Sequence, residues 1–397
     1  MKRYPITPEY LSSAPERLVK LYQDLEETIL EYICEQLKTG DANEKTIELI
    51  RGMQRRGLDL EKIEKAIRKT LHLSQQEYDR LFDVAVERNR AFYDDTLDKL
   101  SLVKEKSRES ALQAQIRAIK RQTGGELTNI TQSLGFALRG PDGHVKAMGL
   151  RESYTKILDD AALQIQNGVS GYNGAIRNAI EKLTDSGVQW IDYSSGWHNR
   201  VDVAVRRAAM TSISQLSGRY SEELAEEIGA EFVEVSAHRG ARDVGVGPKN
   251  HKSWQGKVYH IGGDITYEGK KYRDFRTVTG YGTGEGLNGF NCRHKWTPFV
   301  PGVMERSYTD AELKAIDPPP FTYEGQEYTA YQATQKQREL EAAMRNVKRR
   351  MVAFKAAGDQ DAYNQASARH RALSREYTAF SKAADLPEQR ERTKVYG

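Results

Sequence analysis

The sequence has few cysteines, no long apolar run and little net charge, and each shortage excludes a class of protein. Two cysteines in 397 residues cannot make a disulfide framework, and they fit a reducing compartment. No run approaches the roughly 18 apolar residues of a membrane-spanning helix, and the first residues lack the apolar core of a signal peptide. A net charge of +4, from 60 basic and 56 acidic residues, does not indicate a dedicated nucleic-acid binder.

Glycine, tryptophan and histidine are concentrated in the middle of the chain. Residues 240–302 hold 13 of the 32 glycines. All four tryptophans lie between residues 190 and 296, together with five of the eight histidines in nearly the same window. The middle therefore differs in composition from the plainer sequence on either side of it, and we treat it as a separate domain.

The sequence before this middle domain is predicted to be helical. Residues 1–125 contain apolar residues at steps of three and four, the period of one buried helical face. Within them, Ser74 followed by Glu77 resembles a capping box that would start a further helix. Residues 126–230 are predicted to be a central helical region, which begins with a glycine-containing connection at 126–150.

Residues 231–302 are predicted to be a small glycine-rich α+β domain, because the pattern changes to the alternation typical of strands. The predicted strands and the hairpin lie at 231–238, 257–261, 265–272 and 295–299. Residues 303–397 are predicted to be a proline linker followed by a basic αα-hairpin. The expected fold class is thus α+β, with a mostly helical N-terminal half and a C-terminal αα-hairpin.

The excess of positive charge lies in the C-terminal hairpin. Its basic residues are either a solvated helix face or a surface that contacts the phosphates of DNA. The candidates for DNA contact are Lys348, Arg349, Arg350, Arg369, Arg371 and Arg375.

The middle domain carries four residues that can ligate a metal: His238, His251, Cys292 and His294. Imidazole and thiolate are usual zinc ligands, and residues 292 and 294 share a face of an extended segment. No paired zinc-finger spacing occurs, so these side chains fit equally well as hydrogen-bonding groups in a glycine-rich fold. A catalytic cysteine activated by a histidine is a further alternative. We predict no bound metal and no cofactor; if a metal is bound, these four residues are the candidate ligands.

The glycine run from Gly280 to Gly286 contains G-x-G spacings. It lacks the strand-then-helix context of a dinucleotide-binding loop and the Gly-Lys-Ser/Thr of a phosphate-binding loop. A flexible or tightly turning loop is therefore the better interpretation. Arg239 and Arg242, close to His238, either bind an anion or pair with internal carboxylates.

Three motifs occur in order along the middle domain: H-x-G-A-R at 238–242, H-x-x-W-Q-G-K at 251–257 and N-C-R-H at 291–294. As a set they resemble the type 2 phage minor capsid protein family, a relative of the Mu F-like head morphogenesis proteins. The segments 192–196, 279–282 and 331–338 and the opening around Tyr4-Pro5 resemble it too, so the resemblance covers the whole chain. One departure is His294, where the wider group often has a second cysteine, and this weakens a cysteine-pair metal site.

The resemblance implies a minor structural protein of a tailed-phage head, without enzymatic activity or a membrane. It implies a place inside the head near the portal, assembly in the host bacterial cytoplasm, and a role in head assembly and in DNA packaging or ejection. Its partners would be the portal protein, capsid or scaffold subunits, and phage DNA. The motif residues, expected to be structural or anion-binding, are His238, Arg239, Arg242, His251, Trp254, Asn291, Cys292, Arg293 and His294. The alternative is a zinc-dependent hydrolase or nuclease that uses the His/Cys cluster of residues 238–294.

Overall fold

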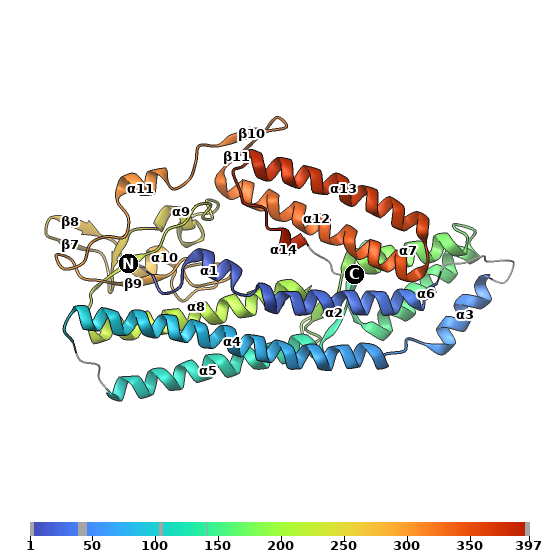
Figure 1. The fold of residues 1–397 in the computed structure, drawn as a ribbon, viewed down its shortest axis with the longest axis horizontal. Helices are drawn as coiled ribbons and strands as arrows, with labels where there is room; N and C mark the ends of the chain where they lie inside the picture. Colours follow the sequence, from blue (N-terminus) through green and yellow to red (C-terminus); the bar gives the residue numbers. More distant parts are fainter. Residues whose placement is uncertain (1–3, 39–45, 103–105, 141, 394–397) are drawn as a thin grey trace. The chain divides into compact units, whose positions relative to one another are not determined.

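The computed structural model describes residues 4–38, 46–102, 106–140 and 142–393 (Figure 1). The chain folds into two compact units, each assembled from three separate stretches of sequence. Four of the sequence boundaries between the units fall within α4 (Glu61–Lys99), α5 (Lys106–Gln132), α8 (Val201–Glu227) and α12 (Ala330–Ala357). The division at residues 125, 230 and 302 stays a prediction, because these units follow spatial contact and not the order of the chain.

Unit 2, made of residues 16–75, 126–206 and 336–397, consists of helices and one small sheet. The sheet has four antiparallel strands in the order β2-β1-β3-β4. Its other elements include the C-terminal pair of helices that the periodicity predicts. The bounds are α2 (Glu16–Glu35), α3 (Thr46–Arg56), β1 (Leu134–Arg139), β2 (Val145–Gly149), α6 (Leu150–Gln166), α7 (Tyr172–Ser186), β3 (Gln189–Ile191), β4 (His198–Arg200), α13 (Gln360–Ala383) and α14 (Arg390–Thr393).

The C-terminal helices α12 and α13 form the predicted αα-hairpin (Figure 1). Gly358 has a φ of 76°, a left-handed conformation that suits glycine at the end of a helix. Asp359 caps α13 by accepting a hydrogen bond from the Ala362 N–H at 3.0 Å. The same carboxylate accepts two hydrogen bonds from Arg177 of α7, at 2.8 and 2.9 Å, which ties the hairpin turn to the rest of unit 2.

Two local predictions for this region are wrong. Ser74 does not start a helix, because α4 continues through it from residue 61 to 99. Its hydroxyl is buried within unit 2, where it donates to the Leu71 carbonyl and accepts a hydrogen bond from Tyr22. This tertiary contact outweighs the capping preference of serine. The connection at 126–150 is also more regular than expected, since α5 extends to Gln132 and β1 and β2 follow it.

Unit 1, made of residues 1–15, 76–125 and 207–335, contains the glycine-rich middle of the chain. Its main sheet is antiparallel, in the order β6-β5-β9, and the predicted strands and hairpin are confirmed. A further hairpin, β10–β11, lies in the stretch expected to be only a linker. The bounds are α1 (Pro8–Ser13), β5 (Phe232–Val235), η1 (Gly247–Lys249), α9 (His251–Trp254), β6 (Val258–His260), β7 (Ile265–Tyr267), β8 (Lys270–Tyr272), α10 (Phe275–Thr279), β9 (Trp296–Phe299), α11 (Asp310–Ala315), β10 (Phe321–Tyr323) and β11 (Gln326–Tyr328).

The central strand β5 is buried at every position, as expected for a strand with neighbours on both edges. A single apolar cluster joins it to the aromatic residues of the glycine-rich segment: Val233, Val235, Trp254, Tyr259, Phe275, Leu287, Cys292 and Trp296. Helix α8 is fastened to the neighbouring strand, because the Ser221 hydroxyl donates to the Trp296 carbonyl at 2.7 Å. The prediction of an α+β, mostly helical fold is confirmed.

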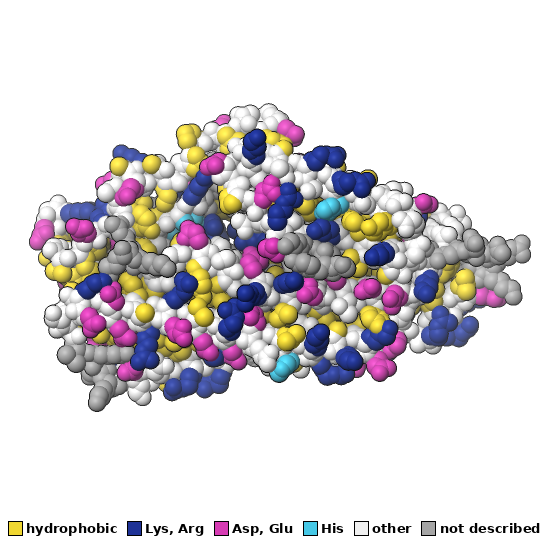
Figure 2. All heavy atoms as spheres, viewed as in Figure 1, with side chains coloured by type: hydrophobic (Ala, Val, Ile, Leu, Met, Phe, Trp, Pro, Cys, Tyr) yellow, Lys and Arg dark blue, Asp and Glu magenta, His cyan; other side chains and the backbone are white. Residues whose placement is uncertain are grey.

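The charged side chains are mixed by sign over the surface. On the face drawn in Figure 2, basic and acidic side chains are interspersed and neither forms one continuous patch. This distribution agrees with the small net charge of the chain. Within the described residues, no helix has the length and apolar character needed to span a membrane.

Candidate functional site

The pairing of β5 with β9 brings the first and last motifs of the middle domain together. Val235 lies opposite Trp296, and the ladder continues where the Ser236 N–H donates to the Lys295 carbonyl at 2.7 Å. His238, just beyond β5, therefore meets His294, just before β9. Their rings stack with centroids 4.3 Å apart and an interplanar angle of 26°.

The short helix α9 brings the second motif to the same place. Asn250 caps this helix by accepting a hydrogen bond from the Ser253 N–H at 3.2 Å. Trp254 is completely buried, and its indole N–H donates to the Pro248 carbonyl at 3.0 Å. The rings of Trp254 and His251 lie with their centroids 4.8 and 5.4 Å from that of His294. All three motifs thus converge on His294.

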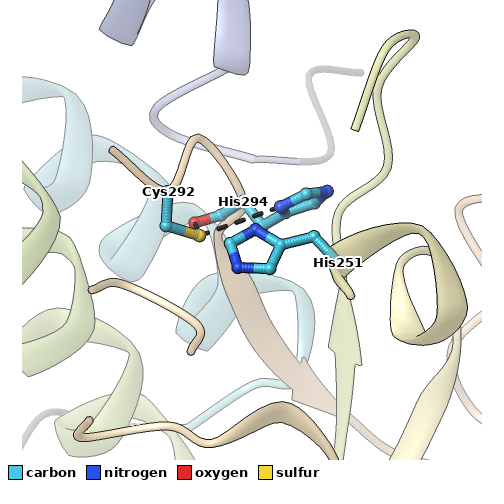
Figure 3. A group of neighbouring side chains, drawn as sticks. All are labelled: His251, Cys292 and His294. Atoms are coloured by element: carbon cyan, nitrogen blue, oxygen red, sulfur yellow. Dashed lines mark hydrogen bonds between the residues drawn. The ribbon is translucent and has the colours of Figure 1, made fainter. Parts of the chain in front are cut away.

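Three side chains point toward one another at the centre of this site (Figure 3). One ligand atom from each of His251, Cys292 and His294 lies within 4.8 Å of the other two. The Cys292 Sγ is 3.7 Å from the His294 Nδ1. All three residues are buried. The structure therefore assembles three of the four metal-ligand candidates, with His238 stacked beside them.

Hydrogen bonds define which ring nitrogens carry a proton. Gln255 Oε1 accepts from the His238 backbone N–H at 3.0 Å, which identifies this atom as the amide oxygen. It also lies 3.0 Å from the His294 Nε2, so that nitrogen donates to it. His251 Nε2 likewise donates to the Glu285 carbonyl at 3.0 Å. In His294 and His251, Nδ1 is left with an unprotonated lone pair.

Burial keeps the cluster uncharged. Desolvation lowers the pKa of His238 to about 3 and that of His251 to about 4. The same effect lowers the pKa of His294 well below its ordinary value. Burial raises the pKa of the Cys292 thiol, so that without a metal it stays protonated at neutral pH. A catalytic cysteine needs a lowered thiol pKa, whereas burial raises the pKa of Cys292. The surroundings of Cys292 therefore do not favour a catalytic thiolate.

A buried lysine adjoins the cluster. Lys295 is 1% exposed, and its ammonium group donates to the Ser214 hydroxyl at 2.8 Å and the His294 carbonyl at 3.1 Å. Desolvation lowers its pKa to about 8. Gln255 and Lys295 also belong to the site, although neither is among the candidate site residues predicted from the sequence. Gln255 lies within the second motif and Lys295 directly follows the third, and these positions are the signal in the sequence that could have identified them.

The glycine run folds into a tight loop, one of the two forms expected for it. A Cβ atom on Gly286 would lie 2.3 Å from the Gly280 carbonyl oxygen, and one on Gly289 would lie 2.4 Å from the Gly284 oxygen. Only glycine fits such close backbone approaches. The loop presents the Glu285 carbonyl to His251. Its glycines therefore support the cluster and do not form a nucleotide-binding loop.

The remaining motif residues surround the cluster. Arg239, Arg242 and Arg293 are half-buried, while Asn291 is exposed and has a φ of 57°. Asparagine tolerates this left-handed conformation better than most residues. Anion binding by the arginines stays a prediction.

The basic residues of the C-terminal hairpin do not form one surface. Arg349 is 1% exposed and donates to the Thr184 carbonyl at 3.2 Å, so its proposed contact with DNA is wrong for this structure. Lys348 donates to the Thr393 carbonyl, and Arg350 pairs with Asp185 at 2.7 Å. The exposed candidates are Arg369, Arg371 and Arg375, all on α13.

Comparison with known proteins agrees with the resemblance carried by the three motifs. The family model of phage minor capsid protein 2 matches residues 6–382, nearly the whole chain. No curated protein matches the chain, and no solved structure does. The chain therefore belongs to the phage minor capsid protein 2 family and is a structural protein of the phage head.

Proposed function

We propose that this protein is a minor, portal-associated component of a tailed-phage head that aids head assembly and DNA packaging or ejection. The observation that carries the proposal is the family match across residues 6–382. Its position would be inside the head near the portal, with portal, capsid or scaffold subunits as neighbours. The buried, uncharged His/Cys cluster supports a structural role, because a substrate has no direct access to these side chains.

A groove in unit 2 supports docking onto the portal protein. It has a volume of about 720 Å³ and lies among α6, α7 and the β1–β2 hairpin. Three of its lining residues are large apolar side chains with high exposure: Val145 at 45%, Leu163 at 54% and Val169 at 73%. Exposed apolar side chains around a concavity are typical of protein-interaction sites.

The test is incorporation of the chain into purified heads. We expect the double variant Leu163→Glu/Val169→Glu to reduce its copy number by about tenfold, because charge in a docking groove leaves an unpaired group at the interface. The matched control is Val246→Glu/Val303→Glu, which alters exposed apolar residues of unit 1 and should leave the copy number unchanged. Normal incorporation of the groove variant would exclude docking through this groove, and absence of the wild-type chain from heads would exclude the proposed function.

The second candidate, a zinc-dependent hydrolase or nuclease, has the convergence of His251, Cys292 and His294 in its favour. Such an enzyme needs a position at the metal that substrate can reach. Incubation of the zinc-loaded full chain with linear DNA tests it. Cleavage that is lost in a His294→Ala variant would support the enzyme, and intact DNA would support the structural role.

A further inference from the structure

We propose that His251, Cys292 and His294 bind one zinc ion, which acts as a structural crosslink inside unit 1. The ligands come from two segments that are far apart in the sequence, the start of α9 and the stretch leading into β9. A metal held by both would fix the glycine-rich loop between them against the sheet. This inference concerns the stability of the domain, and it holds whether or not the chain docks on the portal.

The spacing of the donor atoms fits a tetrahedral zinc site. Zinc binds sulfur at about 2.3 Å and imidazole nitrogen at about 2.0–2.1 Å, which places the two donors about 3.6 Å apart. The observed separation of the Cys292 Sγ and the His294 Nδ1 is 3.7 Å. The His251 donor lies within 4.8 Å of both, so a small side-chain movement completes a three-residue site.

The hydrogen bonds around the cluster are those of metal-bound histidines. A ligating imidazole usually donates its second N–H to a carbonyl or carboxylate, which fixes the tautomer and orients the ring. His294 does so through Gln255, and His251 through the Glu285 carbonyl. In both rings this leaves Nδ1 as the free donor, and Nδ1 of His294 faces the cysteine sulfur (Figure 3). His238 is a positioning residue, because its ring stacks on His294.

The charges near the site are compatible with a bound cation. Zinc requires neutral imidazoles and a thiolate. Burial already keeps the imidazoles of His251 and His294 neutral, and the Lys295 ammonium favours the thiolate form of Cys292. A zinc–thiolate pair carries one net positive charge, so metal binding would favour the neutral amine of Lys295. Three protein ligands leave the fourth position of zinc to a water molecule.

Metal analysis of the purified full-length chain tests the proposal. We expect one zinc ion per wild-type chain and its loss in Cys292→Ala and in His294→Ala. The matched control is Cys34→Ala, which removes the other buried cysteine and should retain the zinc. His144→Ala, on the exposed β1–β2 turn, controls for loss of a histidine outside the cluster.

Cobalt substitution separates loss of the site from loss of the fold. The demetallated wild-type chain, titrated with Co²⁺, should develop a sulfur-to-cobalt charge-transfer band and the intense visible bands of a tetrahedral site. The variant Cys292→His keeps three potential ligands and should bind cobalt without the charge-transfer band. A folded wild-type chain that contains no zinc, gains no thermal stability from added zinc and gives no such band with cobalt would overturn the proposal.

Discussion

The two units of this protein bury polar groups in opposite ways. In unit 1 the groups buried around His294 are three neutral imidazoles and a neutral thiol, with one ammonium, that of Lys295, beside them. Unit 2 buries a network of charges, which come from α2, β4, the start of α8 and α12. The residues of this network are Glu26, Arg200, Asp202, Arg345 and Arg349. The cluster around His294 and the ionic network of unit 2 each join segments that are distant in sequence. Each therefore stabilises the packing of those segments within its own unit.

The difference lies in what compensates for the loss of water. In unit 2, opposite charges do so: Arg349 lies 3.6 Å from Glu26, and Arg200 lies 3.2 Å from Asp202. The arginines hold the pKa of Asp202 far below its usual range. In unit 1, hydrogen bonds between neutral groups do so, and the sulfur and two ring nitrogens remain available to a metal. A buried charged network is sensitive to deletion of one partner, whereas a buried neutral cluster is sensitive to protonation.

The largest effect should come from breaking the ionic network. Glu26→Gln removes the carboxylate beside Arg200 and Arg349 and leaves the buried positive charge of this network compensated by Asp202 alone. We expect a loss of about 3–5 kcal/mol in the free energy of unfolding, confined to unit 2. Hydrogen exchange read out separately for peptides of each unit measures it.

The exposed pair of Lys146 and Glu152 provides the control for this experiment. Its side chains are 72% and 57% exposed, so Glu152→Gln should change stability by no more than about 1 kcal/mol. Equal losses of stability from Glu26→Gln and Glu152→Gln, or a loss of protection in unit 1 caused by Glu26→Gln, would refute the idea that the ionic network stabilises unit 2 separately.

Acid should destabilise unit 1 at a higher pH than unit 2. The pKa of His251 is depressed to about 4, so its contribution to stability is complete above the unfolded pKa of about 6.5 and is lost as pH falls toward 4. At pH 5 the loss in the free energy of unfolding is about 2 kcal/mol for one such histidine. Asp202 also has a depressed pKa, but its contribution is lost only below about pH 4.

Lowering the pH from 7 to 5 should therefore weaken protection from hydrogen exchange in unit 1 before unit 2 responds. Removal of the proposed zinc by acid acts in the same direction, because protons compete with the metal for imidazole. Simultaneous loss of protection in both units at pH 5 would contradict the contrast between neutral and charged interiors.

A smaller loss is expected from Gln255→Leu in unit 1. The substitution removes the acceptor for two buried donors, the His294 ring N–H and the His238 backbone N–H. An unsatisfied buried donor costs about 1–3 kcal/mol, and we expect a loss in that range by urea denaturation. Gln255→Glu keeps an acceptor and should restore part of it. An unchanged midpoint for the leucine variant would show that these hydrogen bonds do not hold the site.

The smallest effect on stability is expected from the exposed arginines of α13. Changing Arg369, Arg371 and Arg375 to Gln should alter stability by less than about 0.5 kcal/mol, since all three are exposed. If these residues contact DNA, the dependence of log affinity on log salt should become shallower by about two to three units. The control Arg51→Gln/Arg55→Gln/Lys69→Gln removes three exposed charges elsewhere in unit 2. If log affinity for DNA depends equally on log salt in both variants, α13 is not a DNA-binding surface.

Local periodicity predicts most of the elements of this fold. The helical stripe before residue 38 and the alternation at 232–235 correspond to α2 and β5, because burial of one face imposes its period on the sequence. The pattern at Ser74 wrongly predicts a helix start, because the Ser74 hydroxyl has a partner, Tyr22, that is 52 residues away. The pattern also does not show that units 1 and 2 are each built from three separate stretches.

The sequence predicts the residue types of the site but not their arrangement in space. The chemistry of His251, Cys292 and His294 makes them candidate ligands, yet the spacing of 41 residues between the first two carries no geometric information. The β5–β9 pairing and the tight glycine loop supply that geometry. Arg349 was assigned to the surface because a run of basic residues is usually solvated, and its burial depends on Glu26, which lies far away in the sequence.

A cryo-EM map of the assembled phage head would show directly whether this chain is a portal-associated head protein. We expect density for this chain inside the head beside the portal, in few copies, with the groove around Leu163 and Val169 against the portal protein. The same map should show a density peak among His251, Cys292 and His294. Heads that package DNA normally and contain no density for this chain near the portal would refute the proposed portal-associated role.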